Sequence, residues 1–187
     1  MTRSVLAGVL VGGASSRMHG SPKGLLPSPD GAPIVQRTCT ILGVLRIPCV
    51  LVGRSAAYAT LGLTELDDEP AGIGPLGGLI ALLRRAGDGW AVAIACDMPL
   101  VTPALVGRLV GAPDAAAVAP KIGGVWQPMF ARYDAKLALP IAVRRAGEGR
   151  RSLQGLLDEL GARELELAPG EERALVDWDT PSDMELS

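Results

Sequence analysis

The sequence predicts an α/β protein of three layers (α/β/α), in which helices cover both faces of a mostly parallel β-sheet. Short apolar runs alternate along the chain with segments of helical periodicity, and this alternation is typical of a parallel sheet. The runs are continuously apolar rather than alternating, as expected of strands buried on both faces. Glycine-rich or acidic stretches follow several of them, and such connections are where α/β proteins place ligands.

The first half of the chain contains three predicted strands and two predicted helices. An apolar run at 5–11 ends at two glycines, which indicates a buried strand. Proline precedes the segment 34–45, whose apolar residues have nearly helical spacing, and proline suits the first turn of a helix. Apolar runs at 48–52 and 61–66 predict further strands, and a helix-like stretch that reaches Arg85 follows the glycine-rich segment 74–78.

The second half begins with a wholly apolar run at 90–95, which predicts a central strand. Thr102-Pro103 carries the signals of a helix start, and the helix is expected to reach Val110. We expect further strands at 115–119, 125–133, 163–167 and 174–177, helices at 135–145 and 152–160, and a short last helix from Pro181.

Ligand-binding residues are expected at one edge of this sheet. Right-handed crossovers place the carboxyl ends of parallel strands along the same edge. Asp67-Asp68, the segment 74–78, Asp97 and Asp179 all follow predicted strands. No repeat or low-complexity linker interrupts the chain, so we expect a single domain over residues 1–187.

Composition excludes several classes of protein. The net charge is −2, with 48% hydrophobic and 20% charged residues, so no basic surface is expected to bind nucleic acid. The three cysteines (Cys39, Cys49 and Cys96) form no CxxC pair, which argues against zinc and a disulfide framework and favours thiols in a reducing cytosol. With no signal-peptide pattern and no run of about 20 apolar residues, we expect a cytoplasmic protein without a membrane partner.

The first predicted strand leads into an unusual loop, LVGGASSRMHGSPKG, from Leu10 to Gly24. Glycines and small hydroxyl residues leave main-chain N–H groups open to phosphate oxygens. Arg17 adds a planar fork of donors and Lys23 a mobile charge, which together suit a triphosphate. The loop matches neither Walker A nor GxGxxG, and a plain strand-to-helix connection is the alternative.

The loop resembles the signature L-x-G-G-x-S-x-R-M-G-x-x-x-K of the MobA-like nucleotidyltransferases, the family of the molybdenum cofactor guanylyltransferases. GPLGGL at 74–79, CDMPLVTPAL at 96–105, QPMFARY at 127–133 and VDWDTPSDM at 176–184 also resemble family segments, so the likeness covers nearly the whole chain. The loop alone is shared with sugar and isoprenoid nucleotidyltransferases. The resemblance implies a Rossmann-like sheet of the nucleotide-diphospho-sugar transferase type.

The resemblance implies Mg²⁺-dependent transfer of GMP from GTP to the phosphate of molybdopterin-bound molybdenum, with release of pyrophosphate. The product would pass to a molybdoenzyme or chaperone. A cytidylyltransferase or a transferase acting on a sugar or alditol phosphate is an alternative of the same chemistry. A nucleotide-binding adaptor without turnover is an alternative of another class, because His19 replaces the family's glycine and Asp179 its asparagine.

Site residues follow from the matched motifs. The resemblance assigns catalytic roles to Arg17, Lys23 and Asp97, and metal binding to Asp97 and Asp179. It assigns nucleotide binding to Leu10, Val11, Gly12, Gly13, Ser15, Lys23, Asp67, Asp68, Gly74, Pro75, Leu76 and Asp97. Guanine presents N1–H and N2 amino donors side by side, so a carboxylate suits it; spacing allows either Asp67 or Asp68, and Asp68 is preferred.

Structural alternatives accompany these assignments. Asp97 or Asp179 could instead cap a following helix, and Asp67-Asp68 could be a solvated turn. Cys96 is expected to fill the core. Trp126 either walls a pterin site or is core. Five arginines of the C-terminal half either hold a phosphate or a partner protein, or lie scattered on the surface: Arg132, Arg144, Arg145, Arg150 and Arg151.

Overall fold

The structure is a computed structural model that describes residues 3–11, 22–54 and 56–178. Several predicted features lie outside the described residues: Gly12, Gly13, Ser15, Arg17, His19, Asp179 and the helix predicted from Pro181.

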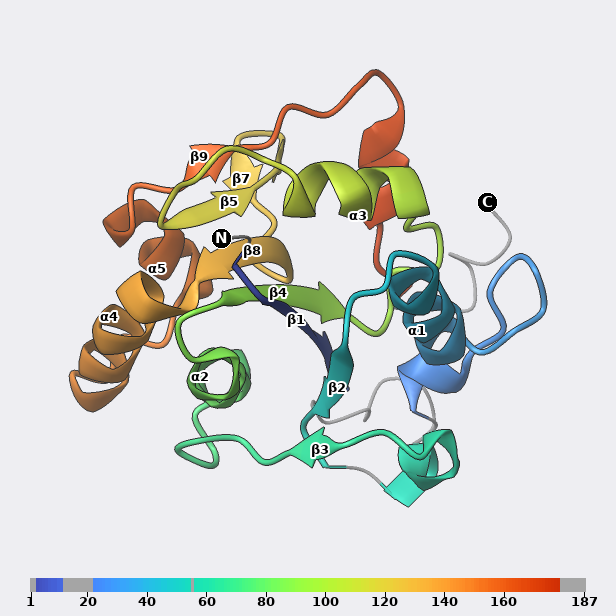
Figure 1. Ribbon diagram of the computed structural model, residues 1–187, viewed down its shortest axis with the longest axis horizontal. Helices are drawn as coiled ribbons and strands as arrows, with labels where there is room; N and C mark the ends of the chain where they lie inside the picture. Colours follow the sequence, from blue (N-terminus) through green and yellow to red (C-terminus); the bar gives the residue numbers. More distant parts are fainter. Residues whose placement is uncertain (1–2, 12–21, 55, 179–187) are drawn as a thin grey trace.

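A seven-stranded sheet forms the centre of the molecule, with the strand order β3-β2-β1-β4-β8-β5-β9 (Figure 1). The strands are β1 (Val5–Leu10), β2 (Cys49–Val52), β3 (Glu65–Leu66), β4 (Trp90–Ala95), β5 (Ala117–Ala119), β8 (Phe130–Asp134) and β9 (Arg163–Glu164). Within this sheet, the described strand β8 runs antiparallel to its neighbours β4 and β5, and the other pairs are parallel. The predicted mostly parallel sheet is therefore confirmed.

Five α-helices and three 3₁₀ helices surround the sheet in the described part of the chain. They are α1 (Ile34–Val44), α2 (Pro75–Ala86), α3 (Pro103–Val110), α4 (Ala135–Gly147), α5 (Leu153–Glu159), η1 (Lys23–Leu25), η2 (Ala56–Leu61) and η3 (Glu171–Leu175). A separate hairpin joins β6 (Lys121–Ile122) to β7 (Val125–Trp126). No helix among the described residues has the length and apolar character needed to cross a membrane.

Helix starts follow the local sequence signals. The side chains of Thr102, Asp134 and Ser152 accept hydrogen bonds from the first-turn N–H groups of α3, α4 and α5. These bonds satisfy donors that have no partner within a helix. Pro75 and Pro103 occupy the first turns of α2 and α3, where the missing N–H of proline has no cost.

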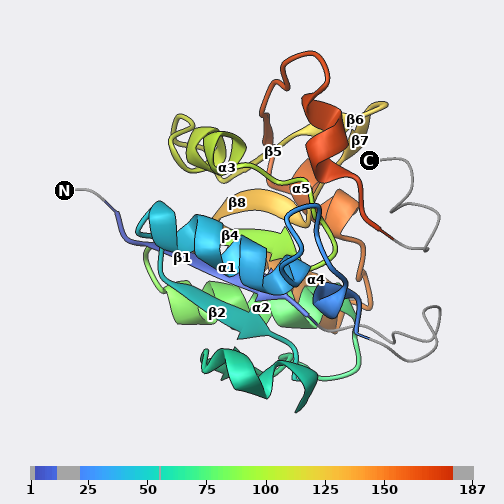
Figure 2. The same ribbon diagram turned by 90° about the vertical axis from the view of Figure 1, so that its right-hand side faces the viewer.

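Alternate residues of each strand enter two hydrophobic cores, one on each face of the sheet. In β4, Val92 and Ile94 pack with α1 and α3, whereas Ala91 and Ala93 pack with α2, α4 and α5. The period of two along a strand explains this division. Figures 1 and 2 show α1 and α3 on one side of the sheet and α2 on the other. The predicted three-layer arrangement is confirmed.

Three sequence predictions need correction. The run 125–133 is not one strand, because a turn separates β7 from β8, with the Phe130 N–H donating to the Gln127 carbonyl oxygen at 3.0 Å. The segment 174–177 is not a strand, since Ala174 and Leu175 end η3 and bury their side chains against the core instead. The predicted strands 61–66 and 163–167 shrink to β3 and β9, two residues each, at the margins of the sheet.

Candidate active site

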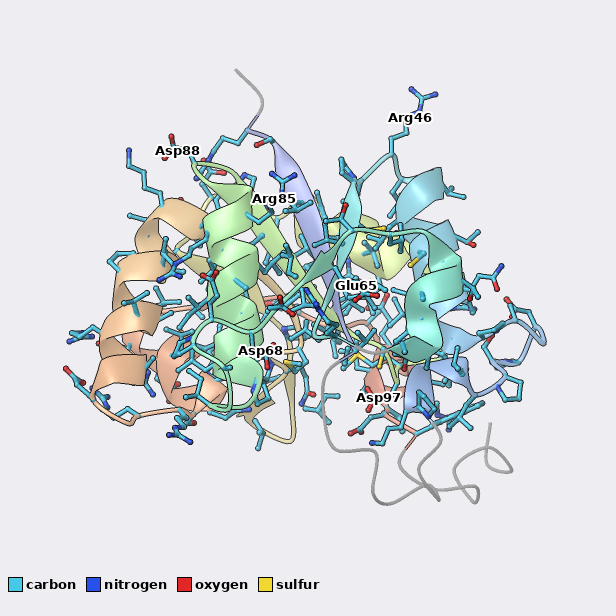
Figure 3. The ribbon with its side chains drawn as sticks, turned by 90° about the horizontal axis from the view of Figure 1, so that it is seen from below. Arg46, Glu65, Asp68, Arg85, Asp88 and Asp97 are labelled. Carbon is cyan, nitrogen blue, oxygen red and sulfur yellow. The ribbon has the colours of Figure 1, made fainter. Side chains whose placement is uncertain are left out.

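Strand register brings the predicted site segments to one edge of the sheet. Leu10 at the end of β1 pairs with Val52 of β2 and Ala95 of β4, and Val52 pairs with Leu66 of β3. The segments that follow these strands therefore emerge side by side. Figure 3 shows the result, with Asp68 and Asp97 toward one end of the molecule and Asp88 and Arg46 at the opposite end.

The antiparallel strand β8 brings one more segment to this edge. Because β8 runs the other way, its first residue rather than its last lies here, and Phe130 pairs with Ile94. The turn before β8 is held in place by the Ala95 N–H, which donates to the Met129 carbonyl oxygen at 2.8 Å. The matched segment that begins at Gln127 thus starts beside the end of β4.

Lys23 and Asp97 meet at the middle of the edge. The Lys23 Nζ lies 3.3 Å from Asp97 Oδ2, and both side chains are largely buried. Burial raises the pKa of Asp97, Lys23 opposes that rise, and the nearby Asp177 adds to it. A buried carboxylate is stabilised by positive charge, so this site favours a further cation beside Asp97.

Asp97 does not cap the following helix. Thr102 performs that role, because its Oγ1 accepts a hydrogen bond from the Leu105 N–H at 3.2 Å. The main-chain oxygen of Asp97 accepts from the Trp178 N–H at 2.9 Å, which places Asp177 beside the Asp97 side chain. The side chain of Asp97 thus remains available to a ligand.

The two acidic residues after β3 differ in their surroundings. Asp67 is exposed and pairs with Arg54, with 2.8 Å between Asp67 Oδ2 and Arg54 Nη2. Asp68 is half-buried, and burial, followed by the charge of Asp67, raises the pKa of Asp68. Asp68 therefore has the surroundings of a ligand-binding carboxylate, whereas Asp67 has those of a surface ion pair.

The glycines of the GPLGGL stretch let the Asp68 loop lie against α2. A Cβ added to Gly77 would meet the Pro70 carbonyl oxygen at 2.5 Å, and a Cβ added to Gly78 would lie 3.1 Å from Asp68 Oδ1. Gly74 has φ 75° immediately before the helix, a conformation that side chains other than glycine rarely adopt. This stretch thus positions Asp68 at the N-terminal turn of α2.

Several predicted nucleotide-binding residues present only main-chain atoms to the edge. The side chains of Leu10, Val11 and Leu76 are buried in the two cores. The Leu10 carbonyl oxygen accepts from the Cys96 N–H at 3.2 Å, and the Val11 N–H donates to the Val52 carbonyl oxygen at 2.9 Å. Pro75 is exposed at the start of α2.

A cavity of about 210 Å³ adjoins Asp97 on the side of β8. It is lined by Ala95, Asp97, Met98, Gln127, Pro128, Met129, Leu175 and Asp177. Asp177 lies in the matched segment VDWDTPSDM, but it was not among the predicted site residues. Its position two residues before the predicted metal ligand Asp179 could have identified it as a further candidate.

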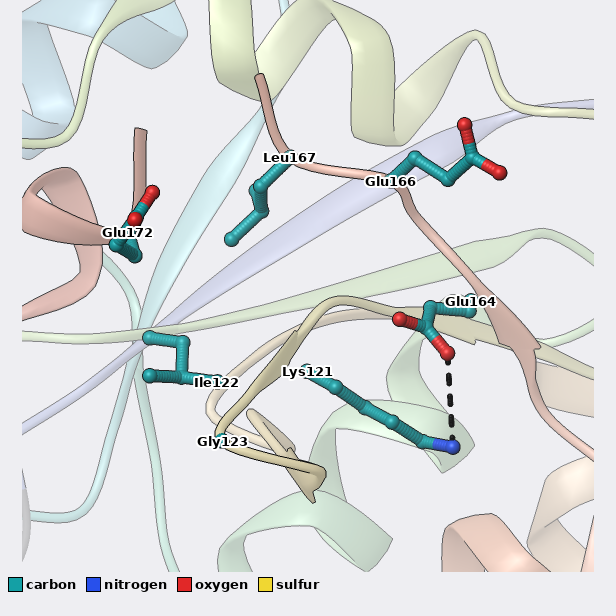
Figure 4. Close-up of a pocket in the computed structure, with 7 residues that line it drawn as sticks. All are labelled: Lys121, Ile122, Gly123, Glu164, Glu166, Leu167 and Glu172. Atoms are coloured by element: carbon teal, nitrogen blue, oxygen red, sulfur yellow. Dashed lines mark ion pairs between the residues drawn. The ribbon is translucent and has the colours of Figure 1, made fainter. Parts of the chain in front are cut away.

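A second cavity, of about 430 Å³, lies beside the β6–β7 hairpin (Figure 4). Glu164, Glu166 and Glu172 line it, with Lys121 as the one cation, and Lys121 Nζ lies 3.5 Å from Glu164 Oε2. Lys121 also lies over the ring of Trp126, 4.1 Å from its centre. The excess of negative charge makes this cavity a poor site for phosphate groups.

Two of the five C-terminal arginines have buried structural roles, whereas Arg151 is exposed. Arg132 is buried and donates to the carbonyl oxygens of Val110, Ala112 and Pro113, each at 2.7 Å. Arg145 is also buried and donates to Glu159 and to the Ser152 carbonyl oxygen. Neither residue is at the surface or at the edge that carries Asp97.

Arg144 and Arg150 also form ion pairs with Glu159. Trp126 belongs to the core, and its Nε1 donates a hydrogen bond to Asp158 Oδ1 at 2.9 Å.

The three cysteines are free thiols. Cys96 is buried, and burial is the main cause that raises its pKa to about 12, so it is a neutral thiol and not a nucleophile at neutral pH.

The residues of the edge fit a bound Mg²⁺. The described residues contain no group of three or more acidic, histidine or cysteine side chains that could enclose a metal. Mg²⁺ does not need one, because proteins usually hold it with one or two carboxylates while phosphates and water supply the other oxygens. Asp97, with Asp177 nearby, offers this type of donor.

Fold and strand ends together define an α/β protein of the type that places its ligands at the carboxyl edge of the sheet. Comparison of the sequence with models of known protein families identifies the class of protein more closely. The family model for the MobA-like NTP transferase domain matches residues 7–163. The chain belongs to this family and is a nucleotidyltransferase.

Relatives with curated names agree with this assignment. A molybdenum cofactor guanylyltransferase from Pseudomonas putida is 36% identical over 171 residues, covering 88% of each chain. The guanylyltransferase of Pseudomonas aeruginosa strain PAO1 is 32% identical over 181 residues, covering 92% of this chain and 89% of the relative.

Solved structures show the same fold. The molybdopterin-guanine dinucleotide biosynthesis protein A of Archaeoglobus fulgidus has a TM-score of 0.75 at 23% identity, covering 97% of this chain and 95% of that one. The 2-C-methyl-D-erythritol 4-phosphate cytidylyltransferase of Thermus thermophilus has a TM-score of 0.68 at 18% identity, covering 100% and 96%. Both similarities concern the fold alone.

Proposed function

We propose that this protein transfers GMP from GTP to the phosphate of molybdopterin-bound molybdenum and releases pyrophosphate. The observation that carries the proposal is the partly buried Lys23–Asp97 pair at the carboxyl edge, with 3.3 Å between Lys23 Nζ and Asp97 Oδ2. It supplies one cation for phosphate and one carboxylate for a metal ion at the same place. The names of the curated relatives support the choice of guanine and of the molybdopterin acceptor.

The order of strands suggests where each part of the reaction would take place. Along the edge, Asp68 follows β3, Lys23 follows β1, Asp97 follows β4, and the turn at 127–129 precedes β8. Guanine would lie toward Asp68, whose carboxylate can accept from the N1–H and N2 amino groups. The triphosphate would lie at Lys23 and Asp97, and the acceptor would approach from the cavity beside Gln127 and Met129.

The proposed reaction needs no general base. The acceptor is a phosphate monoester, mostly a dianion at neutral pH because its second pKa is about 6. One of its oxygens would form a bond to the α-phosphorus of GTP, while the bond between that phosphorus and the bridging oxygen to the β-phosphorus breaks. Pyrophosphate would leave with the electron pair of that bond.

Lys23 would hold the phosphates in line and neutralise the charge that develops on the leaving pyrophosphate. Asp97 would hold Mg²⁺, with Asp177 and the undescribed Asp179 as the further candidates. When bound, the ion would supply additional positive charge at the phosphate oxygens.

The test is pyrophosphate release by the purified protein with Mg²⁺, molybdopterin loaded with molybdate, and each nucleoside triphosphate in turn. We expect release with GTP, and at least about tenfold less with CTP, ATP or UTP, because a site built to accept from guanine leaves its acceptors unpaired with other bases. A preference for CTP would replace the proposal with a cytidylyltransferase. Tight GTP binding without release, with molybdopterin or with sugar and alditol phosphates, would replace it with the adaptor.

A further inference from the structure

Tyr58 is a buried residue near the proposed site that none of the matched motifs contains. It belongs to η2, between β2 and β3, and only 2% of its surface is exposed. Its side chain packs in the same core as α1 and α3. Burial is the main cause that raises the pKa of Tyr58, so its hydroxyl stays protonated and can both donate and accept.

The Tyr58 hydroxyl holds the residue that follows Lys23. It accepts a hydrogen bond from the Gly24 N–H, with 3.2 Å between the Gly24 nitrogen and Tyr58 Oη. Tyr58 and Cys96, the residue before Asp97, belong to the same hydrophobic core. The hydroxyl thus fixes the turn that carries Lys23 to the core beside the end of the strand that carries Asp97.

Close packing reinforces this connection. A Cβ added to Gly24 would lie 2.9 Å from Tyr58 Oη and 3.2 Å from the Cβ of Cys96. Only glycine lets the turn come this near to both residues. The turn itself is closed by the Leu26 N–H, which donates to the Lys23 carbonyl oxygen at 3.0 Å.

We propose that Tyr58 is a positioning residue that sets the place of the Lys23 ammonium relative to Asp97. This inference rests on the proposed function, in which Lys23 binds the phosphates of GTP. Without the hydroxyl, the Lys23–Gly24 turn loses its hydrogen bond to the Tyr58 side chain in the core. The Lys23 ammonium would then reach the phosphates from a wider range of positions, which weakens its contribution in the transition state.

The test removes the hydroxyl alone, in Tyr58→Phe, and compares it with Thr38→Val. Thr38 is a matched control because it is also buried and its Oγ1 donates to the Ile34 carbonyl oxygen at 3.0 Å, away from the proposed site. We expect kcat/KM for GTP to fall about tenfold in Tyr58→Phe and less than about twofold in Thr38→Val. Equal effects of the two substitutions would show that Tyr58 only fills the core.

A double-mutant cycle with Lys23→Met separates positioning from general destabilisation. If Tyr58 acts through Lys23, then Tyr58→Phe changes kcat/KM less than about twofold in the Lys23→Met background, because the two effects are not additive. A loss of about tenfold in both backgrounds would overturn the inference.

A second measurement keeps this inference distinct from the proposed function. Amide hydrogen exchange of Gly24, followed by NMR, should speed up at least about tenfold in Tyr58→Phe and not in Thr38→Val, and the dissociation constant of GTP should rise in the first variant alone. If the wild-type protein releases no pyrophosphate but both changes occur, the proposed function falls and the positioning role stands. If the wild-type protein is active and neither change occurs, the positioning role alone falls.

Discussion

Both ends of the sheet hold charged side chains that are largely buried. Close hydrogen bonds pair the carboxylate at one end, whereas the carboxylate at the other end has a longer ion pair and borders a cavity. At the amino end, Arg3 forms two hydrogen bonds with Asp134, of 2.6 and 2.9 Å. The guanidinium groups of Arg3 and Arg132 each lie 4.2 Å from the centre of the Trp90 ring. At the carboxyl end, Asp97 meets Lys23 at 3.3 Å beside a cavity that Asp177 also lines.

The pKa shifts express the same difference. The hydrogen bond from Arg3 is the main cause that lowers the pKa of Asp134, whereas burial is the main cause that raises the pKa of Asp97. A carboxylate with a lowered pKa is stabilised by the fold, and one with a raised pKa is held there at a cost. The Arg3–Asp134 pair at the amino end therefore stabilises the protein, whereas the charge of Asp97 at the carboxyl end is held against the cost of burial.

The largest expected effect is the loss of GMP transfer in Asp97→Asn. We expect kcat/KM to fall at least about 1,000-fold, because the amide is a weak ligand for Mg²⁺. The free energy of unfolding should stay equal or rise by up to about 1 kcal/mol, since a buried charge is removed. Pyrophosphate release and urea unfolding measure the two quantities. Asp88→Asn, at the opposite end, is the control, and normal turnover in Asp97→Asn would contradict the metal-binding role.

The opposite pattern is expected for Arg132→Met. Three carbonyl oxygens lose their donor, so the free energy of unfolding should fall by about 3 kcal/mol. The kcat of the folded fraction should change less than about twofold, because Arg132 does not reach the proposed site. The exposed Arg151→Met is the control. A large loss of kcat in fully folded Arg132→Met would show that Arg132 affects the proposed site, and it would contradict the separate roles of the two ends.

Within the carboxyl end, Asp68 and Asp67 should differ. Asp68→Asn should raise the KM for GTP about 10- to 30-fold, because the carboxylate proposed to accept from guanine is lost. Asp67→Asn should change this KM less than about threefold, since it breaks only an exposed ion pair with Arg54. Initial rates at several GTP concentrations decide between them, and the reverse ranking would assign the base contact to Asp67.

The smallest expected effect concerns the pH dependence of stability. The folded pKa of Asp134 lies below the ordinary value of 3.8, so the unfolded state binds its proton first as the pH falls. The stability that Asp134 contributes is full above the unfolded pKa and is lost as the pH falls through the folded pKa. We expect the difference in unfolding free energy between wild type and Asp134→Asn to be about 1 to 2 kcal/mol at pH 7.

Urea unfolding between pH 2 and 7 measures this difference, which should shrink only below about pH 4. The Asp97→Asn variant should show the opposite sign in metal-free buffer. Because the folded pKa of Asp97 is raised, wild type loses stability relative to that variant as the pH rises above 3.8. The same sign for both variants would contradict the contrast between the two ends.

Much of the fold was predictable because its signals are local. Continuous apolar runs identified β1, β2 and β4, and prolines marked the starts of α1 and α3. Strand ends then placed Lys23, Asp68 and Asp97 at one edge, which register confirms for the strands concerned. The roles of these residues in binding stay predictions.

Other features depend on contacts between distant segments. An apolar run is the same in either strand direction, so the antiparallel course of β8 was not predictable. Arg132 and Arg145 were expected at the surface or at a ligand. Carbonyl groups at the end of α3 and just after it hold Arg132 inside, and Glu159 with the Ser152 carbonyl oxygen holds Arg145. Tyr58 reaches Gly24 across 34 residues, and no spacing rule marks such a pair.

Because β8 runs antiparallel to β4, the carboxyl edge of the sheet is formed by two kinds of chain segment. The parallel strands β1, β3 and β4 contribute segments that leave the sheet, whereas β8 contributes a segment that enters it from the β6–β7 hairpin. A change in the length or composition of that hairpin would alter the wall of the cavity at Gln127–Met129 without disturbing Lys23 or Asp68. Under the proposed function, exchange of this hairpin alone would give the same nucleotide-binding edge a different acceptor, a route open to evolution and to protein engineers alike.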